Sequence, residues 1–212
     1  PRNKPSKTPS NPAVATFRKR LRCLVSPPRR FTESASIGKR LKPRTDPSTA
    51  SVTKRVVFDT NALFRFHVRA LILHMAQAQA ITPLWSARTV EELRGVLSAR
   101  GKSGAEDFLG QLPTSTILAT GAGIAANGFR DPGDLHVVQA AIDGHASVIV
   151  TQNARDFPAK HLRPLGIERL SPDGFFATHL AALPVGLDPA DLRRAGLSQT
   201  ANRLSPFLAD RG

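Results

Sequence analysis

The chain has 212 residues, is 41% hydrophobic and carries a formal net charge of +14. This length suits one domain with flanking segments, and no apolar run reaches the roughly 18–20 residues that span a bilayer, so we expect no transmembrane helix. The single cysteine, Cys23, excludes an internal disulfide and favours a reducing compartment, so we expect a cytoplasmic protein.

Most of the positive charge lies in residues 1–52, which hold 13 Lys and Arg against two acidic residues. Residues 53–212 hold 17 basic and 14 acidic residues, so they are nearly neutral. The first segment is basic, rich in Pro and Ser and without an apolar period, and we predict that it is disordered. It is either a basic arm for nucleic acid, a transit peptide, or an upstream extension foreign to the natural protein. The third alternative rests on the chain opening with Pro1 and on Val52, which suits an alternative start codon just before the first strand.

The first predicted strand is the apolar run 56–58, which ends on Asp59. Thr60 and Asn61 are turn and capping residues, and a helix is predicted from residue 62 to about residue 80. Ligands of parallel sheets bind outside the carboxyl ends of the strands. Asp59 is therefore either a metal ligand or only the cap of the next helix.

The next segment is predicted as a short strand or extended turn over 81–85, followed by a helix over 87–99 with Ser86 as its N-cap. This helix carries Glu91 and Glu92 beside its apolar stripe. The two glutamates are either ligands or a solvated pair that favours the positive end of the helix.

A short helix over 104–111 and a strand near 116–119 lead to a second acidic pair, Asp131 and Asp134, at the start of a helix that reaches Ile142. Residues three apart at a helix start project together. Their like charges repel, and a bound cation would relieve that repulsion. Helix capping is the alternative, and it accounts for one aspartate better than for two.

A second buried strand over 147–150 again ends in polar groups, namely Thr151, Asn153 and Asp156. The remaining predicted elements are a short helix and an edge strand over 162–170, a helix capped by Ser171, and a tail or small helix over 183–212.

Strands alternate with helices along the chain, which predicts an α/β fold of three layers, α/β/α, with a central parallel sheet. Such a sheet brings the acidic groups to one edge. The sequence has no serine elbow, no Cys–His pair and no useful phosphate-binding loop, which leaves oxygen ligands suited to Mg²⁺ or Mn²⁺. A cluster of carboxylates that holds such ions is a known arrangement for the hydrolysis of phosphodiester bonds.

Four motifs in this order and spacing resemble a PIN domain: VVFDTNAL at 56–63, EEL at 91–93, DPGDLHVVQAA at 131–141 and VIVTQNARDFP at 148–158. The closing GIERLSPDGFF at 166–176 is similar to the VapC-like toxins of bacterial toxin–antitoxin pairs.

The resemblance covers about residues 54–182, so we take 53–182 as the domain, with 1–52 as an extension before it and 183–212 after it. It implies a metal-dependent ribonuclease that uses Mg²⁺ or Mn²⁺. It also implies RNA as the substrate, a small antitoxin protein as the partner and a homodimer.

Residue by residue, the resemblance places the first metal-binding acid on Asp59, the second on Glu92 with Glu91 as the fallback, and the third on Asp134 with Asp131 as its neighbour. These acids would fix the ion that cuts the RNA backbone.

The fourth acid departs from the family pattern, because Asn153 stands where many members have an acid. Either Asp156 supplies the missing charge at the catalytic site, or Asn153 binds a water or the metal more weakly, and the number of metal ions is left open. Asn61 and Thr151 would support the acids by hydrogen bonds. The weakest assignments are four RNA-contacting residues: Arg65, Arg69, Arg155 and Lys160.

Two other classes compete with the nuclease. A non-catalytic PIN-like module that binds RNA or protein is favoured by Asn153. A phosphoacceptor at Asp59 is disfavoured, because the dehalogenase-type motif needs a second aspartate where Asn61 stands.

Overall fold

The computed structural model of the chain describes residues 53–100, 105–112, 117–118, 129 and 131–209. The prediction of a disordered segment over 1–52 lies outside these residues, as does the loop 101–104 and most of the linker before Asp131.

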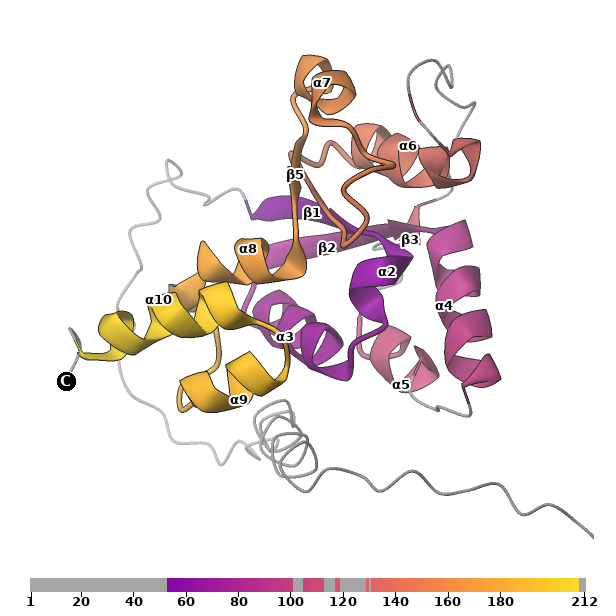
Figure 1. Cartoon of the computed structure of the whole chain (residues 1–212). Helices are drawn as coiled ribbons and strands as arrows, with labels where there is room; N and C mark the ends of the chain where they lie inside the picture. Colours follow the sequence, from indigo (N-terminus) through magenta and orange to yellow (C-terminus); the bar gives the residue numbers. More distant parts are fainter. Residues whose placement is uncertain (1–52, 101–104, 113–116, 119–128, 130, 210–212) are drawn as a thin grey trace, which may run out of the picture.

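Five parallel strands form one sheet in the order β3-β2-β1-β4-β5 within the part of the chain that the structure describes (Figure 1). The strands are β1 (Lys54–Phe58), β2 (Ile81–Ser86), β3 (Ile117–Leu118), β4 (Val148–Val150) and β5 (Glu168–Leu170). The predicted α/β fold with a central parallel sheet is therefore confirmed. The segment 81–85, predicted as a strand or an extended turn, is a strand next to β1.

Helices follow the strands along the chain. They are α2 (Thr60–Leu63), α3 (Phe66–Gln77), α4 (Ala87–Ala99), α5 (Ala105–Leu109), η2 (Pro132–Asp134), α6 (Leu135–Asp143), α7 (Ala159–Leu162), η3 (Arg163–Leu165), α8 (Pro172–Ala177), η4 (Leu180–Ala182), α9 (Pro189–Arg194) and α10 (Ser198–Ala209). The single helix predicted from residue 62 is in fact α2 and α3, because Arg65 between them has extended backbone angles. None of the described helices is long and apolar enough to cross a membrane.

The sheet is covered on both faces, which is why β1 reads as a continuous apolar run. Successive side chains of a strand point to opposite faces. Val56 and Phe58 pack with α3, α8, α9 and α10, whereas Val57 packs with α6 and α7 on the other side (Figure 1). On the first face the rings of Phe58 and Phe175 meet edge to face, with centroids 5.7 Å apart.

The C-terminal segment forms two helices, where the sequence predicted a tail or one small helix. Leu192 and Leu204 are buried in the same apolar cluster as β1. The Asp173 carboxylate on α8 accepts hydrogen bonds from the backbone N–H of Gln199 and Thr200 at the start of α10, both at 2.9 Å. Helices α9 and α10 are therefore packed parts of the folded body.

Candidate functional site

The strand order reverses between β1 and β4. The chain continues from β1 to β2 and β3 on one side, and β4 and β5 lie on the other side. Such a reversal of strand order is where open parallel sheets bind ligands, outside the carboxyl ends of the strands. Phe58 pairs with Val150 in this register, so the residues that follow them, Asp59 and Thr151, leave the sheet side by side.

Asp59 is a buried carboxylate held in a fixed orientation. Its side chain is 3% exposed, and its backbone N–H donates to Val150 O at 3.0 Å. Its Oδ2 accepts hydrogen bonds from Thr151 Oγ1 at 2.7 Å and from Asn61 Nδ2 at 3.3 Å. Burial raises the pKa of Asp59, and these hydrogen bonds oppose that effect. The two residues expected to support Asp59 thus both donate to it.

Glu92 faces the same edge from α4. Its Oε2 accepts a 2.6 Å hydrogen bond from Thr60 Oγ1, in the residue next to Asp59. Its Oε1 accepts from Arg88 Nε at 3.0 Å and lies 3.6 Å from His136 Nε2. Glu91 is exposed on the neighbouring side of the helix. The geometry therefore favours Glu92, the first choice from the sequence, over Glu91.

Asp134 shows that the acids gather in space. Burial and repulsion raise its pKa to about 6, and the repelling carboxylates, in decreasing order of effect, are those of Asp59, Asp131, Asp156 and Glu92. Because Coulomb interactions fall with distance, all four lie near Asp134. The structure thus brings together the acids from four separate motifs.

Asp131 is the outer member of its pair. It is exposed and caps η2, and its Oδ1 accepts a 2.7 Å hydrogen bond from the backbone N–H of Gly133. The capping alternative therefore describes Asp131, whereas Asp134 is the inner carboxylate of the cluster.

Asn153 stands beside Asp156 after β4. Its side-chain amide donates to the Asp156 carboxylate, and its backbone N–H donates to Thr151 Oγ1 at 2.9 Å. The asparagine that replaces the expected acid thus orients the nearest remaining acid. Thr151 links this loop to Asp59.

Arg169 on β5 holds the same loop in place. Its Nη1 donates to Phe157 O at 2.9 Å and to the carbonyl oxygen of Ala154. The sequence does not reveal this role, because Arg169 lies 12 residues or more beyond its partners in the chain.

His136 is a second residue that sequence reasoning missed. Its side chain is 9% exposed, and its Nδ1 lies 2.6 Å from Ser86 Oγ, the N-cap of α4. Burial lowers the pKa of His136. Its Nε2 faces Glu92 and makes no hydrogen bond within the described residues. His136 therefore packs the start of α6 against the start of α4.

Two of the four proposed RNA-contacting residues donate hydrogen bonds to backbone carbonyl oxygens. Arg65 Nη1 donates to Ala195 O at 3.0 Å, and Arg69 is 6% exposed and donates to Leu63 O. Contact with RNA is therefore withdrawn for Arg69, whose guanidinium group is buried against a backbone carbonyl. Arg65 is exposed, so its contact with RNA stays a prediction.

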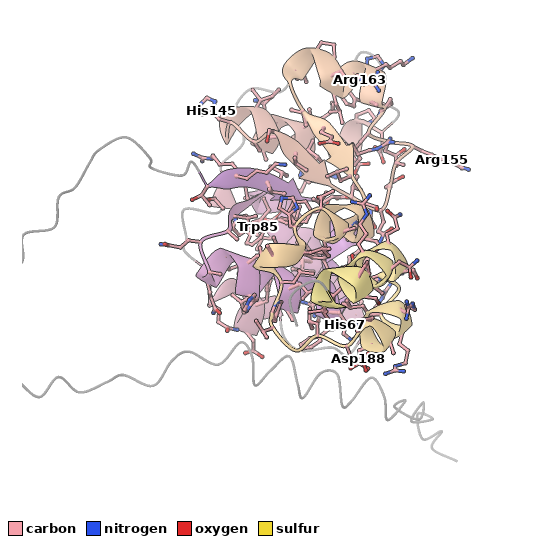
Figure 2. The ribbon with its side chains drawn as sticks, turned by 90° about the vertical axis from the view of Figure 1, so that its left-hand side faces the viewer. His67, Trp85, His145, Arg155, Arg163 and Asp188 are labelled. Atoms are coloured by element: carbon pink, nitrogen blue, oxygen red, sulfur yellow. The ribbon has the colours of Figure 1, made fainter. Side chains whose placement is uncertain are left out.

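The other two, Arg155 and Lys160, are exposed. Arg155 extends away from the body of the molecule (Figure 2). Contact with RNA stays a prediction for both residues.

The acidic cluster fits a hard divalent cation in charge and donor type. Its side chains offer carboxylate oxygens, the ligands that Mg²⁺ and Mn²⁺ prefer. Their repulsion is large enough to raise the pKa of Asp134, and a cation would remove it. In the part of the chain that the structure describes, no three His, Cys, Asp or Glu side chains already converge on one point. Binding would therefore require these side chains to close in.

Comparison with known proteins gave one result. Residues 55–155 match the family model of the PIN domain. This range contains Asp59, Glu92 and Asp134, and it ends before Asp156 and the C-terminal helices. No curated protein and no solved structure matched significantly. The resemblance to a PIN domain is confirmed over the matched residues, and the narrower resemblance to VapC-like toxins stays a prediction.

Proposed function

We propose that this PIN-domain protein is a metal-dependent endoribonuclease that hydrolyses RNA phosphodiester bonds. PIN domains are generally nucleases, which supports the hydrolase class. The observation that carries the proposal is the grouping of the Asp59, Glu92 and Asp134 carboxylates beyond the carboxyl ends of β1 and β4, where hydrogen bonds hold Asp59 and Glu92 in place. The raised pKa of Asp134 agrees with this grouping, and a bound cation would relieve the repulsion between the acids.

Asp59, Glu92 and Asp134 are the residues that would hold Mg²⁺ or Mn²⁺, with Asp131 beside them. A bound ion of this kind would polarise the phosphate and make water a better nucleophile. The chain's own contribution is orientation, because Thr151 and Asn61 fix Asp59 while Thr60 fixes Glu92.

Asp156 is the residue we assign as the fourth acid. It lies near enough to Asp134 to raise the pKa of that residue, and Asn153 donates a hydrogen bond to its carboxylate. Asp156 therefore adds negative charge at the side of the cluster that follows β4.

We also propose that the protein is the toxin of a toxin–antitoxin pair and forms a homodimer. The support is the sequence resemblance at 166–176. The partner would be a small antitoxin protein that blocks the acidic cluster.

The test of the nuclease compares the full chain with Asp59→Asn and with Asp107→Asn, an exposed acid on α5. Each is incubated with total cellular RNA in Mg²⁺, Mn²⁺ or EDTA. We expect cleavage that requires metal, is reduced at least 100-fold in Asp59→Asn and is retained in Asp107→Asn, since ligand loss removes most metal catalysis. Thermal unfolding checks that both variants are folded. Equal background cleavage in all samples would reject the nuclease.

The second candidate is a binding module without catalysis. Asn153 favours it, because an amide replaces an acid at the end of β4. Binding of Mn²⁺ without cleavage of any RNA would support this candidate.

A further inference from the structure

Arg88 places a guanidinium group at the rim of the acidic cluster. It is the second residue of α4, its side chain is 56% exposed, and its Nε donates to Glu92 Oε1 at 3.0 Å. Its Nη2 reaches the η2 turn, because a Cβ added to Gly133 would lie 3.4 Å from it. Gly133 stands between Asp131 and Asp134, so Arg88 spans from α4 to the turn that carries two of the acids.

Both carboxylate oxygens of Glu92 already have partners. Thr60 Oγ1 donates to Oε2, and Arg88 Nε donates to Oε1. Each carboxylate oxygen can accept more than one contact, but a cation bound at Oε1 repels the positively charged guanidinium group of Arg88. Thr60 is 5% exposed and sits on the short helix α2, whereas Arg88 is exposed on a long, flexible stem. Arg88 is therefore the partner that leaves.

A guanidinium group released at this rim is suited to phosphate. Its five N–H donors form a planar fork that matches two phosphate oxygens. Arg65 and Arg94 have other partners, since Arg65 donates to Ala195 O and Arg94 pairs with Glu106 at 2.6 Å.

Resting on the nuclease function proposed above, we propose that Arg88 is a substrate-binding residue. It exchanges its ion pair with Glu92 for a phosphate of the RNA when a cation occupies the acids. The competing role is a structural one, in which Arg88 only positions Glu92.

The two roles predict opposite effects on metal binding. If the Arg88 guanidinium competes with the cation for Glu92, its removal leaves the affinity for Mn²⁺ unchanged or higher. If Arg88 only positions Glu92, its removal lowers that affinity. A direct titration of metal in the absence of RNA separates these cases.

The experiment uses the full chain, Arg88→Gln, Arg88→Lys and, as the matched control on the same helix, Arg94→Gln. Calorimetry measures the binding of Mn²⁺ alone. Fluorescence anisotropy measures the binding of a slowly cleaved, phosphorothioate-linked single-stranded RNA in Mn²⁺ at several salt concentrations. Thermal unfolding confirms that each variant is folded.

We expect Arg88→Gln to bind the RNA probe about tenfold more weakly, because a charge-assisted contact is lost. The slope of log affinity against log salt should shrink by about 0.7, the value for one phosphate contact on a single strand. Arg88→Lys should recover part of the loss, and Arg94→Gln should match the original chain. The affinity of Arg88→Gln for Mn²⁺ should not fall.

Three results would overturn the inference: equal RNA affinity in Arg88→Gln and Arg94→Gln, weaker Mn²⁺ binding by Arg88→Gln, or no RNA binding by the original chain. A failure of the proposed nuclease function would give a different result. In that case the probe binds in an Arg88-dependent manner, yet RNA stays intact in both Mg²⁺ and Mn²⁺.

Discussion

Asp134 illustrates what single residues contribute to this site. The acids of the cluster are ordinary side chains, and their chemistry comes from their neighbours. Burial, with four carboxylates nearby, raises the pKa of Asp134 from 3.8 to about 6. Hydrogen bonds from Thr151 and Asn61 act in the other direction on Asp59. The folded protein therefore holds a proton on Asp134 at a pH where the unfolded chain has lost it.

This shift predicts how stability depends on pH in EDTA. Between about pH 4 and pH 6 the folded state binds more protons at Asp134 than the unfolded state does, so the contribution of this group to stability is present at low pH and is lost as the pH rises. The change is at most about 1 kcal/mol, because the carboxylate is partly exposed and solvent screens it. Urea unfolding at pH 4, 5, 6 and 7 measures it.

The matched variant is Asp134→Asn, which cannot ionise. Its stability at pH 7 should exceed that of the original chain, because one repelling charge is gone. If Asp134→Asn loses stability to the same extent as the original chain between pH 4 and pH 6, Asp134 does not carry this dependence.

At the scale of elements, α10 depends on a residue outside itself. Three donors at its start, the backbone N–H groups of Gln199 and Thr200 and the Thr200 hydroxyl, point to the Asp173 carboxylate on α8. Helix starts leave such N–H groups without partners within the helix. Asp173 therefore caps α10 from another helix and fixes the angle at which the two pack.

We expect Asp173→Ala to lower the free energy of unfolding by about 1–2 kcal/mol, the usual result of losing a cap. Chemical unfolding measures this change. Asp107→Ala, which removes an exposed acid from α5, is the comparison and should change stability by less than about 0.5 kcal/mol. An equal effect in the two variants would show that Asp173 has no capping role.

At the scale of the whole molecule, the C-terminal helices share one core with the central strand. The two helices and the link between them add five buried side chains to the first face of the sheet, namely Leu192, Ala195, Leu197, Ala201 and Leu204. Burial of apolar area contributes about 25 cal/mol per Å². The sequence resemblance ended at residue 182, whereas this core continues to residue 204.

This shared core predicts that a chain ending at residue 182 is not stable. Removal of residues 183–212 exposes one face of α3 and α8. We therefore expect the shortened chain to lose its cooperative thermal transition, while the full chain keeps a cooperative transition. Circular dichroism during heating compares the two. A cooperative transition of similar midpoint in both would instead support the domain boundary predicted at residue 182.

The local sequence pattern alone predicted secondary-structure elements of this protein. The apolar run before Asp59 predicted β1, and Ser86 and Ser171 were expected as N-caps, which both are in the structure. The strand and the helix caps depend on the conformational preferences of neighbouring residues, so they can be predicted from short stretches of sequence. The order of the acidic motifs was enough to suggest the PIN domain that the family match confirms over residues 55–155.

Tertiary structure decided which side chains meet. Thr60 and Glu92 are 32 residues apart, Ser86 and His136 are 50 apart, and the hydrogen bond from Thr151 to Asp59 spans 92. Such contacts depend on strand order and register, which come from packing on both faces of the sheet. For the same reason, the fold decided that Arg65 holds the C-terminal segment and that Arg88, which the sequence did not single out, stands beside the acids.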